Sequence, residues 1–213
     1  MTSYRTLDLG LGESVAAEIE IKRSRFLGQA CRVESEEHAR AFIADVRAAY
    51  HDARHHCTAF VIGARGDLQR SNDDGEPAGT AGRPMLEVVT GRELSDVVVV
   101  VTRWFGGILL GAGGLVRAYG DATAAVLDQA GVRRREELAI GVVTVPVAES
   151  GAFEHRLRQV ADVVAVEYGN AVNFTVAVRD VDDLDRQLAA WSSGSIRVDP
   201  MGSQWRDVAN PAL

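Results

Sequence analysis

A run of five valines followed by a threonine, Val97–Thr102, constrains the fold of this chain more than any other stretch. β-Branched residues favour strands, and an uninterrupted apolar run is typical of a strand buried within a sheet. Upstream, Ser14–Ile21 alternates apolar with polar residues, which indicates a half-buried strand. Apolar residues also recur at helical spacing after Ser35, a predicted N-cap, and before Gly131, a predicted C′ glycine. The first part of the chain therefore predicts helices packed on a sheet.

These patterns assign most of the first part of the chain to regular elements. The predicted strands are Ser14–Ile21, Phe26–Val33, Cys57–Ile62 and Val97–Thr102, and the predicted helices are residues 35–50, Met85–Thr90 and Leu115–Ala130. Gln69–Pro84 shows no periodicity and contains glycine and proline, so it is predicted as one long loop. A loop of that length inside a compact domain is usually functional or disordered.

The last third of the chain predicts a second domain with the element order βαββαβ, a ferredoxin-like sandwich. Ser150 is predicted to cap its first helix, and Ser195–Val198 is the predicted last strand. The charged run Val132–Glu137 is predicted as the linker between domains. We therefore expect an α+β protein with domains at residues 1–137 and 138–208 and a tail at 209–213.

Charge, cysteine content and the length of apolar runs argue against several classes of protein. The net charge of −7 argues against a basic nucleic-acid clamp, so any RNA contact requires a local arginine patch. Cys31 and Cys57 are the only cysteines, too few for a disulfide framework. Met1–Leu11 lacks the pattern of a signal peptide, and the apolar runs are too short for a membrane span. These features predict a cytoplasmic protein.

Two of the four segments that carry reactive side chains are rich in cations or histidine. Lys22–Phe26 (KRSRF) places three cations between two strands, where they either contact phosphates or acidic protein or form a solvated hairpin edge. Asp52–Cys57 (DARHHC) has three types of zinc ligand, but neighbouring residues on a strand point to opposite faces. We therefore predict no metal site, with one histidine of the pair facing the functional surface as an acid or base.

A third segment, residues 71–84, holds three carboxylates within four positions. Asp73, Asp74 and Glu76 are able to hold Mg²⁺ or a cationic ligand, although the EF-hand pattern is absent. The alternative is an ordinary polar turn. The sequence leaves both interpretations open.

The fourth segment, Arg103–Tyr119, runs from the buried strand through a glycine-rich stretch into a helix. Free amides at that helix start suit a phosphate or carboxylate, and two arginines flank the glycines. Trp104 or Phe105 is placed to stack on a base. Known nucleotide motifs fail here, because Ala112 stands where a P-loop needs lysine and Val116 where a dinucleotide fold needs its third glycine.

The candidate site residues come from these segments. The catalytic candidates are His55, His56, Asp73, Asp74 and Glu76. The candidates for binding an anionic ligand are Arg54, Thr80, Arg103, Gly106, Gly107, Gly111, Gly113, Gly114, Arg117 and Tyr119. The sequence names no cofactor.

Taken together, the segments resemble one family. KRSRF, DARHHC, NDDGEPAGTAGRPML (Asn72–Leu86) and RWFGGILLGAGGLVRAYG (Arg103–Gly120) are similar, in order and spacing, to the IMPACT family and within it to the bacterial YigZ-type members. The resemblance implies a first domain like the second domain of ribosomal protein S-five. It also implies a second domain like the last ferredoxin-like domain of elongation factor G.

The resemblance also implies a function, because eukaryotic relatives regulate translation by binding the activator of a stress kinase. It favours a binding module that contacts RNA or a translation-machinery protein. The alternative is an enzyme acting on a phosphorylated small molecule or nucleotide, with the glycine stretch holding phosphate and the carboxylates holding Mg²⁺. A purely structural protein ranks last, since that role does not require a long acidic glycine loop.

Overall fold

The computed structural model describes residues 3–208. The chain divides into two compact units, of which the second is Glu136–Asp207 and the first is the chain before it together with Val208. Each unit combines helices with a sheet, so the predicted two-domain α+β fold is confirmed. Of the described helices, none is both long enough and apolar enough to span a bilayer. The predicted tail, residues 209–213, lies outside the described residues.

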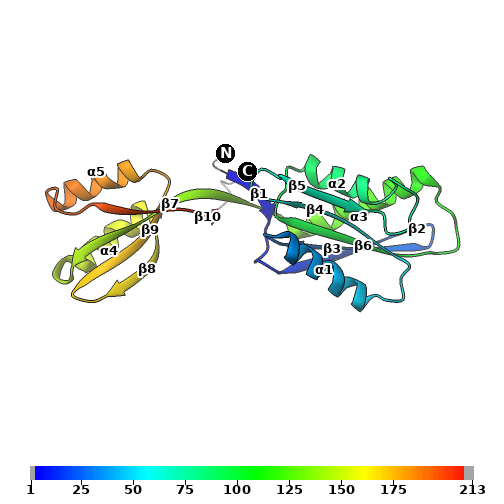
Figure 1. The fold of residues 1–213 in the computed structure, drawn as a ribbon, viewed down its shortest axis with the longest axis horizontal. Coiled ribbons are helices and arrows are strands. Elements are labelled where there is room, and N and C mark those ends of the chain that lie inside the picture. Colours follow the sequence, from blue (N-terminus) through cyan, green and yellow to red (C-terminus); the bar gives the residue numbers. More distant parts are fainter. Residues whose placement is uncertain (1–2, 209–213) are drawn as a thin grey trace. The chain divides into compact units, whose positions relative to one another are not determined.

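The first unit is built on a five-stranded antiparallel sheet with the strand order β2-β3-β6-β4-β5 (Figure 1). The strands are β2 (Ser14–Ile21), β3 (Ser24–Arg32), β4 (His55–Ile62), β5 (Leu68–Asn72) and β6 (Val97–Trp104). The helices are α1 (Glu36–Ala49), α2 (Gly82–Gly91) and α3 (Ala112–Ala130). The valine run forms the central strand β6, as its composition predicts.

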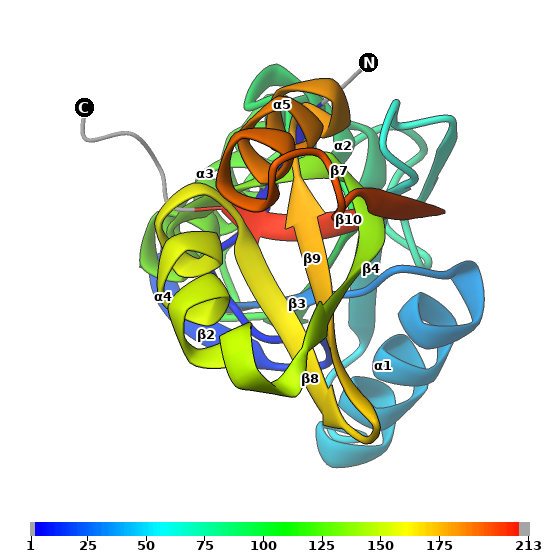
Figure 2. The same ribbon diagram turned by 90° about the vertical axis from the view of Figure 1, so that its left-hand side faces the viewer.

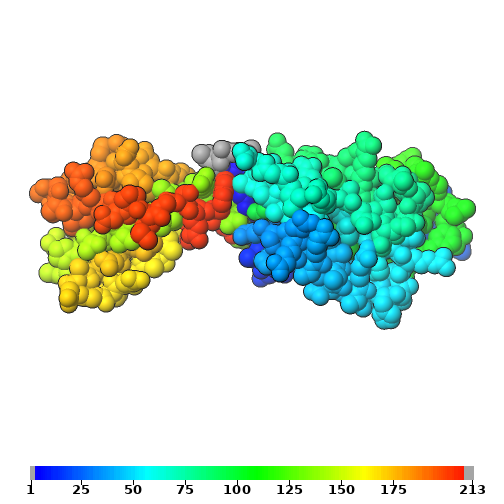
Figure 3. Space-filling view, in the orientation of Figure 1, coloured from blue at the N-terminus to red at the C-terminus, as the bar shows by residue number. Residues whose placement is uncertain are grey.

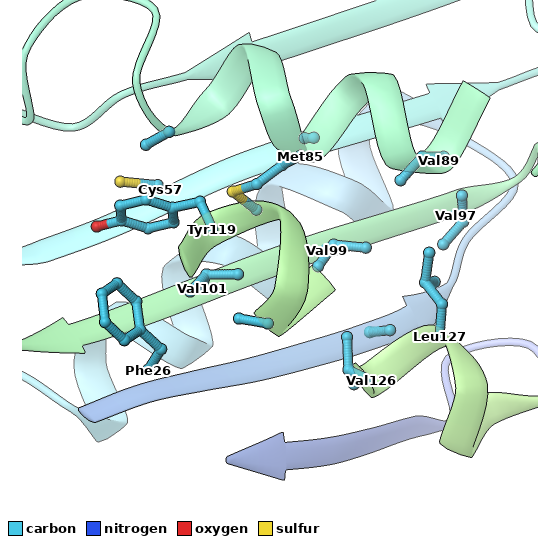
Figure 4. Packing of buried hydrophobic residues seen from close by; sticks show 14 of the residues in the cluster. Phe26, Cys57, Met85, Val89, Val97, Val99, Val101, Tyr119, Val126 and Leu127 are labelled. Atoms are coloured by element: carbon cyan, nitrogen blue, oxygen red, sulfur yellow. The ribbon is translucent and has the colours of Figure 1, made fainter. Parts of the chain in front are cut away.

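Side-chain alternation along β6 divides the interior of this unit into two cores. Val97, Val99 and Val101 pack with residues of α2 and α3, whereas Val98 packs with α1. Figure 1 shows α1 on the opposite side of the sheet from α2 and α3. Figure 4 shows part of the larger core, where Tyr119 of α3 lies beside Cys57 and Phe26. The predicted Ser35 cap is confirmed, since the Ser35 hydroxyl accepts a hydrogen bond from the His38 amide.

The structure differs from the sequence predictions for the first unit in three places. The Gln69–Pro84 loop is shorter than expected, because β5 and the start of α2 take up both of its ends. A further strand, β1 (Ser3–Leu7), was not predicted. The expected linker Val132–Glu137 lies inside a long strand, β7 (Val132–Pro146). Its charges pair across strands, for example Arg133 with Asp8 at 2.6 Å, so the charged run is part of the sheet.

The second unit has the predicted βαββαβ order (Figure 2). After β7 come a 3-10 turn (Val147–Glu149), α4 (Ser150–Val160), β8 (Asp162–Tyr168), β9 (Ala171–Val178), α5 (Val181–Ser192) and β10 (Val198–Val208). Strand β9 pairs with β7 and β8, and β10 pairs with β7. Both helices contribute to one core, through residues such as Leu157 and Leu188.

Two details of the second unit differ from the sequence predictions. Ser150 does not cap α4, because the helix follows directly from the 3-10 turn and the Ser150 hydroxyl donates to the Val147 carbonyl. The last strand begins at Val198, where the predicted strand ends. Most of β10 is exposed, so it carries no apolar alternation that the sequence could reveal.

Candidate functional site

Antiparallel pairing brings three of the four sequence segments to one end of the first sheet. Arg25 is the pairing partner of Trp104 between β3 and β6, and His55 is the pairing partner of Arg103 between β4 and β6. The start of β3, the start of β4 and the end of β6 therefore lie side by side. Two loops complete this end: an acidic loop (residues 73–81) between β5 and α2, and a glycine loop (residues 105–111) between β6 and α3.

Within the acidic loop, Asp73 accepts hydrogen bonds from backbone amides. Its Oδ1 lies 3.0 Å from the Ala81 nitrogen and 2.8 Å from the Gly82 nitrogen, and its Oδ2 lies 2.8 Å from the Gly79 nitrogen. Partial burial acts to raise the pKa of Asp73, but the amide donors outweigh it and hold that pKa below its ordinary value. Because two of the amides open α2, Asp73 takes the role of the missing N-cap side chain.

Asp74 ties the acidic loop to its neighbours. Its Oδ1 accepts a 2.5 Å bond from Arg47 of α1, and its Oδ2 lies 2.6 Å from the His56 amide nitrogen of β4. The Asp74 carbonyl oxygen lies 2.8 Å from Nδ1 of His55. The backbone of Asp74 has a φ of 44°, a conformation that aspartate tolerates better than most residues. The Asp74 carboxylate therefore fixes the path of the loop.

Glu76 is the centre of a buried polar cluster. Its Oε1 lies 2.5 Å from Nη1 of Arg103 and 2.8 Å from the Tyr119 hydroxyl. The side chains of Glu76 and Arg103 are only 4% and 8% exposed, so the ion pair is shielded from water. The guanidinium also lies against the rings of Phe26 and Phe105, at 5.4 and 5.7 Å from their centroids. The charge of Arg103 is thus compensated within the protein.

Cys57 lies next to this cluster, and its thiol is unreactive. Burial raises the pKa of its thiol to about 12, and the thiol donates a 3.0 Å hydrogen bond to the Asp73 carbonyl. Burial likewise raises the pKa of Tyr119, and interaction with Cys57 and Glu76 adds to the effect. Both groups stay protonated at neutral pH, so Cys57 is not a nucleophile in this state.

The glycine loop begins with a close contact to the β2–β3 turn. A Cβ on Gly106 would lie only 2.0 Å from the carbonyl carbon of Arg23, so no other residue fits without movement. The Gly106 amide donates to the Ser24 hydroxyl at 3.1 Å. Lys22 and Arg23 both have positive φ, as the two central residues of a tight hairpin turn do. The cations of this turn are thereby held beside the glycine loop.

Beyond Gly106, the loop opens to solvent. Gly107, Gly111 and Gly113 are exposed, and the N-cap position of α3 has no capping side chain. The amides of Ala112, Gly113 and Gly114 have no acceptor in the described part of the chain, so they point their donors outward.

The segments at this end of the sheet carry exposed cations. Lys22, Arg23, Arg54 and Arg117 are exposed, and none forms an ion pair with a residue between 3 and 208. The loop also exposes apolar side chains: Phe105 is 51% exposed, Ile108 40%, Leu109 82% and Val116 40%. We call this combination of glycine loop, first turns of α3 and flanking cations the glycine surface.

Trp104 is engaged with its neighbours. The Arg25 guanidinium lies 4.8 Å from the centre of its ring, and Tyr50 packs edge-on at 5.8 Å. Its indole nitrogen donates a 2.8 Å hydrogen bond to Asp52. The Trp104 ring therefore packs against the segment before β4. Of Trp104 and Phe105, Phe105 is the exposed ring.

The predicted site residues thus fall into three groups. Glu76, Thr80, Arg103, Tyr119 and His56 are buried, and each is bonded to another protein group. The partly buried group contains Asp73, Asp74, His55, Gly106 and Gly114. The exposed group contains Arg54, Arg117 and the glycines Gly107, Gly111 and Gly113. No group of three metal-ligating side chains suited to an ion occurs among the residues that the structure describes.

Sequence reasoning missed the apolar part of the glycine surface. Ile108, Leu109 and Val116 were treated as part of a glycine stretch or a helix, and only their exposure distinguishes them. A signal was present, because aliphatic residues between glycines in a loop have no core to enter. Ser24 was missed as well, since its contact with Gly106 joins residues 82 positions apart.

Comparison with known proteins adds a family relationship. Residues 22–127 match the family model described as the Impact N-terminal domain. The chain is 42% identical to IMPACT family member YvyE of Bacillus subtilis over 76% of both chains. It is 39% identical to IMPACT family member YigZ of Escherichia coli, covering 84% of this chain and 90% of that protein. A solved structure described as a hypothetical protein matches 94% of this chain and 98% of its own, with 36% identity and a TM-score of 0.62.

Proposed function

Because this chain belongs to the IMPACT family, we propose that it is a translation-associated regulatory protein that binds a partner through the glycine surface. Family membership supports the link to translation. The geometry of the first unit supports the choice of surface, since the carboxylates of the acidic loop are engaged in internal contacts, whereas the glycine loop exposes apolar side chains.

One observation indicates what kind of partner binds the glycine surface. Four apolar side chains, Phe105, Ile108, Leu109 and Val116, are exposed on the glycine loop and the α3 turn that follows it. Exposed apolar groups rimmed by polar residues are typical of protein interaction sites. The flanking Lys22, Arg23, Arg54 and Arg117 favour an acidic partner. We therefore infer an acidic protein of the translation machinery.

An RNA partner fits this surface less well. Aliphatic side chains do not stack on bases, and Trp104 is occupied by Arg25 and Tyr50. On the glycine surface, Phe105 is the exposed ring able to stack.

Binding to purified bacterial ribosomes and translation factors tests the proposal. Sedimentation should recover the wild-type protein with one of these components, and Leu109→Asp should weaken that binding at least about tenfold, since burial of a leucine is worth about 1.5–3 kcal/mol. Leu11→Asp is the matched control, because Leu11 is 53% exposed elsewhere on the first unit.

Two outcomes would contradict the proposal. The first is the absence of binding to any component. The second is tight binding to protein-free ribosomal or transfer RNA that falls steeply with salt and that Arg117→Gln weakens while Leu109→Asp does not, which would assign the surface to RNA.

The alternative, an enzyme acting on a phosphorylated small molecule or nucleotide, is favoured by the environment of His55. The Asp74 carbonyl accepts only, so a bond at 2.8 Å places the proton of neutral His55 on Nδ1. Its Nε2 has no partner within residues 3–208 and is left as a base. A thermal-shift screen against phosphorylated metabolites checks this alternative: stabilisation that His55→Asn abolishes would favour the enzyme, and no stabilising ligand would exclude it.

A further inference from the structure

A second feature of the first unit lies away from the glycine surface. A hollow of about 380 Å³ opens between α1 and the edge of the sheet formed by β4 and β5. Its lining residues are Arg40, Ile43, Ala44, Arg47, Thr58, Phe60, Arg70, Ser71 and Asn72. In Figure 3, α1 is the blue surface of the first unit, and its outer side is open to solvent.

The hollow follows from the geometry of the elements around it. Arg40, Ile43, Ala44 and Arg47 are spaced i, i+3, i+4 and i+7, so they form one side of α1. The floor is β4, whose Phe60 is the pairing partner of Arg70 and so shares a face of the sheet with it. Because β5 is the last strand of the sheet, no further strand fills the space beside it.

The walls of the hollow carry three positive charges and no carboxylate. Arg40 is bound to Glu36 through Nε and Nη2, and Arg47 is bound to Asp74 through Nη2. Arg70 has no acidic partner among the described residues, and its Nη1 donates to the Gln69 carbonyl at 2.9 Å.

These contacts leave donors unused. A guanidinium has five N–H groups in a planar fork, so each of the three arginines keeps donors that its present partners do not take up. Arg40 and Arg47 hold their positions through ion pairs, which reduces the ordering required when a ligand arrives.

We propose that this hollow binds a phosphate group. A tetrahedral phosphate presents oxygens in several directions and accepts bonds from guanidinium groups on different walls, whereas a planar carboxylate is satisfied by one or two. Arg40 and Arg47 approach from α1 and Arg70 from β5, and Asn72, which shares the face of Arg70, adds a neutral donor. The ligand is the phosphate of a small molecule or of an RNA backbone.

Titration calorimetry with inorganic pyrophosphate tests the proposal on the full chain, and a single-stranded uridine decamer serves as the RNA arm. Binding of pyrophosphate alone identifies a small-molecule site, and binding of the decamer alone identifies RNA phosphate as the source. In either arm, Arg70→Gln should weaken binding at least about tenfold, since a hydrogen bond to a charged group contributes about 1.5–3 kcal/mol. Arg40→Gln should act in the same direction, and thermal unfolding checks that both variants fold.

Arg65→Gln is the matched control. It removes the same charge from the turn between β4 and β5, where Arg65 is exposed and paired with Asp67 outside the hollow. Unchanged affinity in this variant supports the assignment. Three results would overturn it: no binding of either probe, equal weakening by Arg65→Gln and Arg70→Gln, or equally tight binding of a glutamate decapeptide, which would show that any anion suffices.

Discussion

The acidic loop and the glycine loop lie at the same end of one sheet, and both carry the marks of a functional segment in the sequence. In the folded protein they differ sharply. Asp73, Asp74 and Glu76 are all bound within the protein, to backbone amides, to Arg47 and to Arg103. The glycine loop is held at its start through Gly106 and near its end by Leu110, which packs on the core, and between them it exposes apolar side chains.

The difference lies in the charge balance of each loop with its surroundings. The acidic loop meets the cations and donors of α1, α2 and β6, so its carboxylates are neutralised inside the fold. The glycine loop has cations beside it but no acid of its own, so that surface retains unneutralised positive charge. The carboxylates of the acidic loop thus stabilise the fold. The glycine loop, which has no carboxylate, is the one we propose to bind a partner.

The largest expected effect comes from removing the buried charge of Glu76 in the acidic loop. Glu76→Gln leaves the buried Arg103 guanidinium without its counter-charge, which should lower the free energy of unfolding by about 3–5 kcal/mol. Chemical denaturation measures the change. Glu87→Gln is the control, because that exposed residue pairs only with Arg83 and should change stability by less than about 1 kcal/mol. Equal effects of the two substitutions would remove the special role of Glu76.

An intermediate effect is expected where the glycine loop contacts the protein. In Gly106→Ala the new methyl group meets the Arg23 backbone, so we expect a loss of about 1–3 kcal/mol from overpacking. Gly113→Ala adds a methyl group with nothing within 4 Å and favours the helix, so its stability should be unchanged or slightly higher. Thermal unfolding of the pair measures the contrast. A destabilised Gly113→Ala variant would mean that the first turn of α3 is packed against the protein.

The smallest effect concerns the cap of α2. Asp73→Asn weakens acceptance from three amides and should cost about 1 kcal/mol at pH 7. Because the folded-state pKa of Asp73 lies below its ordinary value of 3.8, the carboxylate stabilises the fold fully above that value. This stabilisation is lost as the pH falls through the lower, folded-state pKa. Unfolding measured from pH 7 to pH 2 should therefore show the two proteins converging in acid, and a gap that widens there would contradict the assignment.

The fold was predictable where local patterns are strong. The valine run identified β6, and Ser35 with the apolar stripe after it identified α1. Strand β5 was missed because Leu68–Asn72 lies at a sheet edge and is almost wholly polar and exposed. The predicted linker Val132–Glu137 contains the boundary between the two units, but the sequence did not reveal that it is the start of β7, because Arg133 and Arg135 pair with residues more than 100 positions away, Asp8 and Glu34. A polar strand at a sheet edge, or an ion pair between distant residues, leaves no pattern among neighbouring residues of the sequence.

The sequence predicted that these segments lie together, but it could not show what each residue contacts. Strand pairing does bring His55 and Arg103 together, as expected of segments in one surface. The sequence could not reveal that Arg103 forms an ion pair with Glu76. The two residues are 27 positions apart, and only the fold brings them together. It also gave no measure of exposure for Leu109, on which the proposed surface depends.

Amide hydrogen exchange of the protein without a partner tests the contrast between the two loops most directly. The account predicts slow exchange at Gly79, Ala81 and Gly82, whose amides donate to Asp73, and fast exchange at Ala112, Gly113 and Gly114, whose amides have no acceptor in the described structure. Equal protection of the two sets, or slower exchange at the start of α3, would contradict the view that one loop is closed and the other is open.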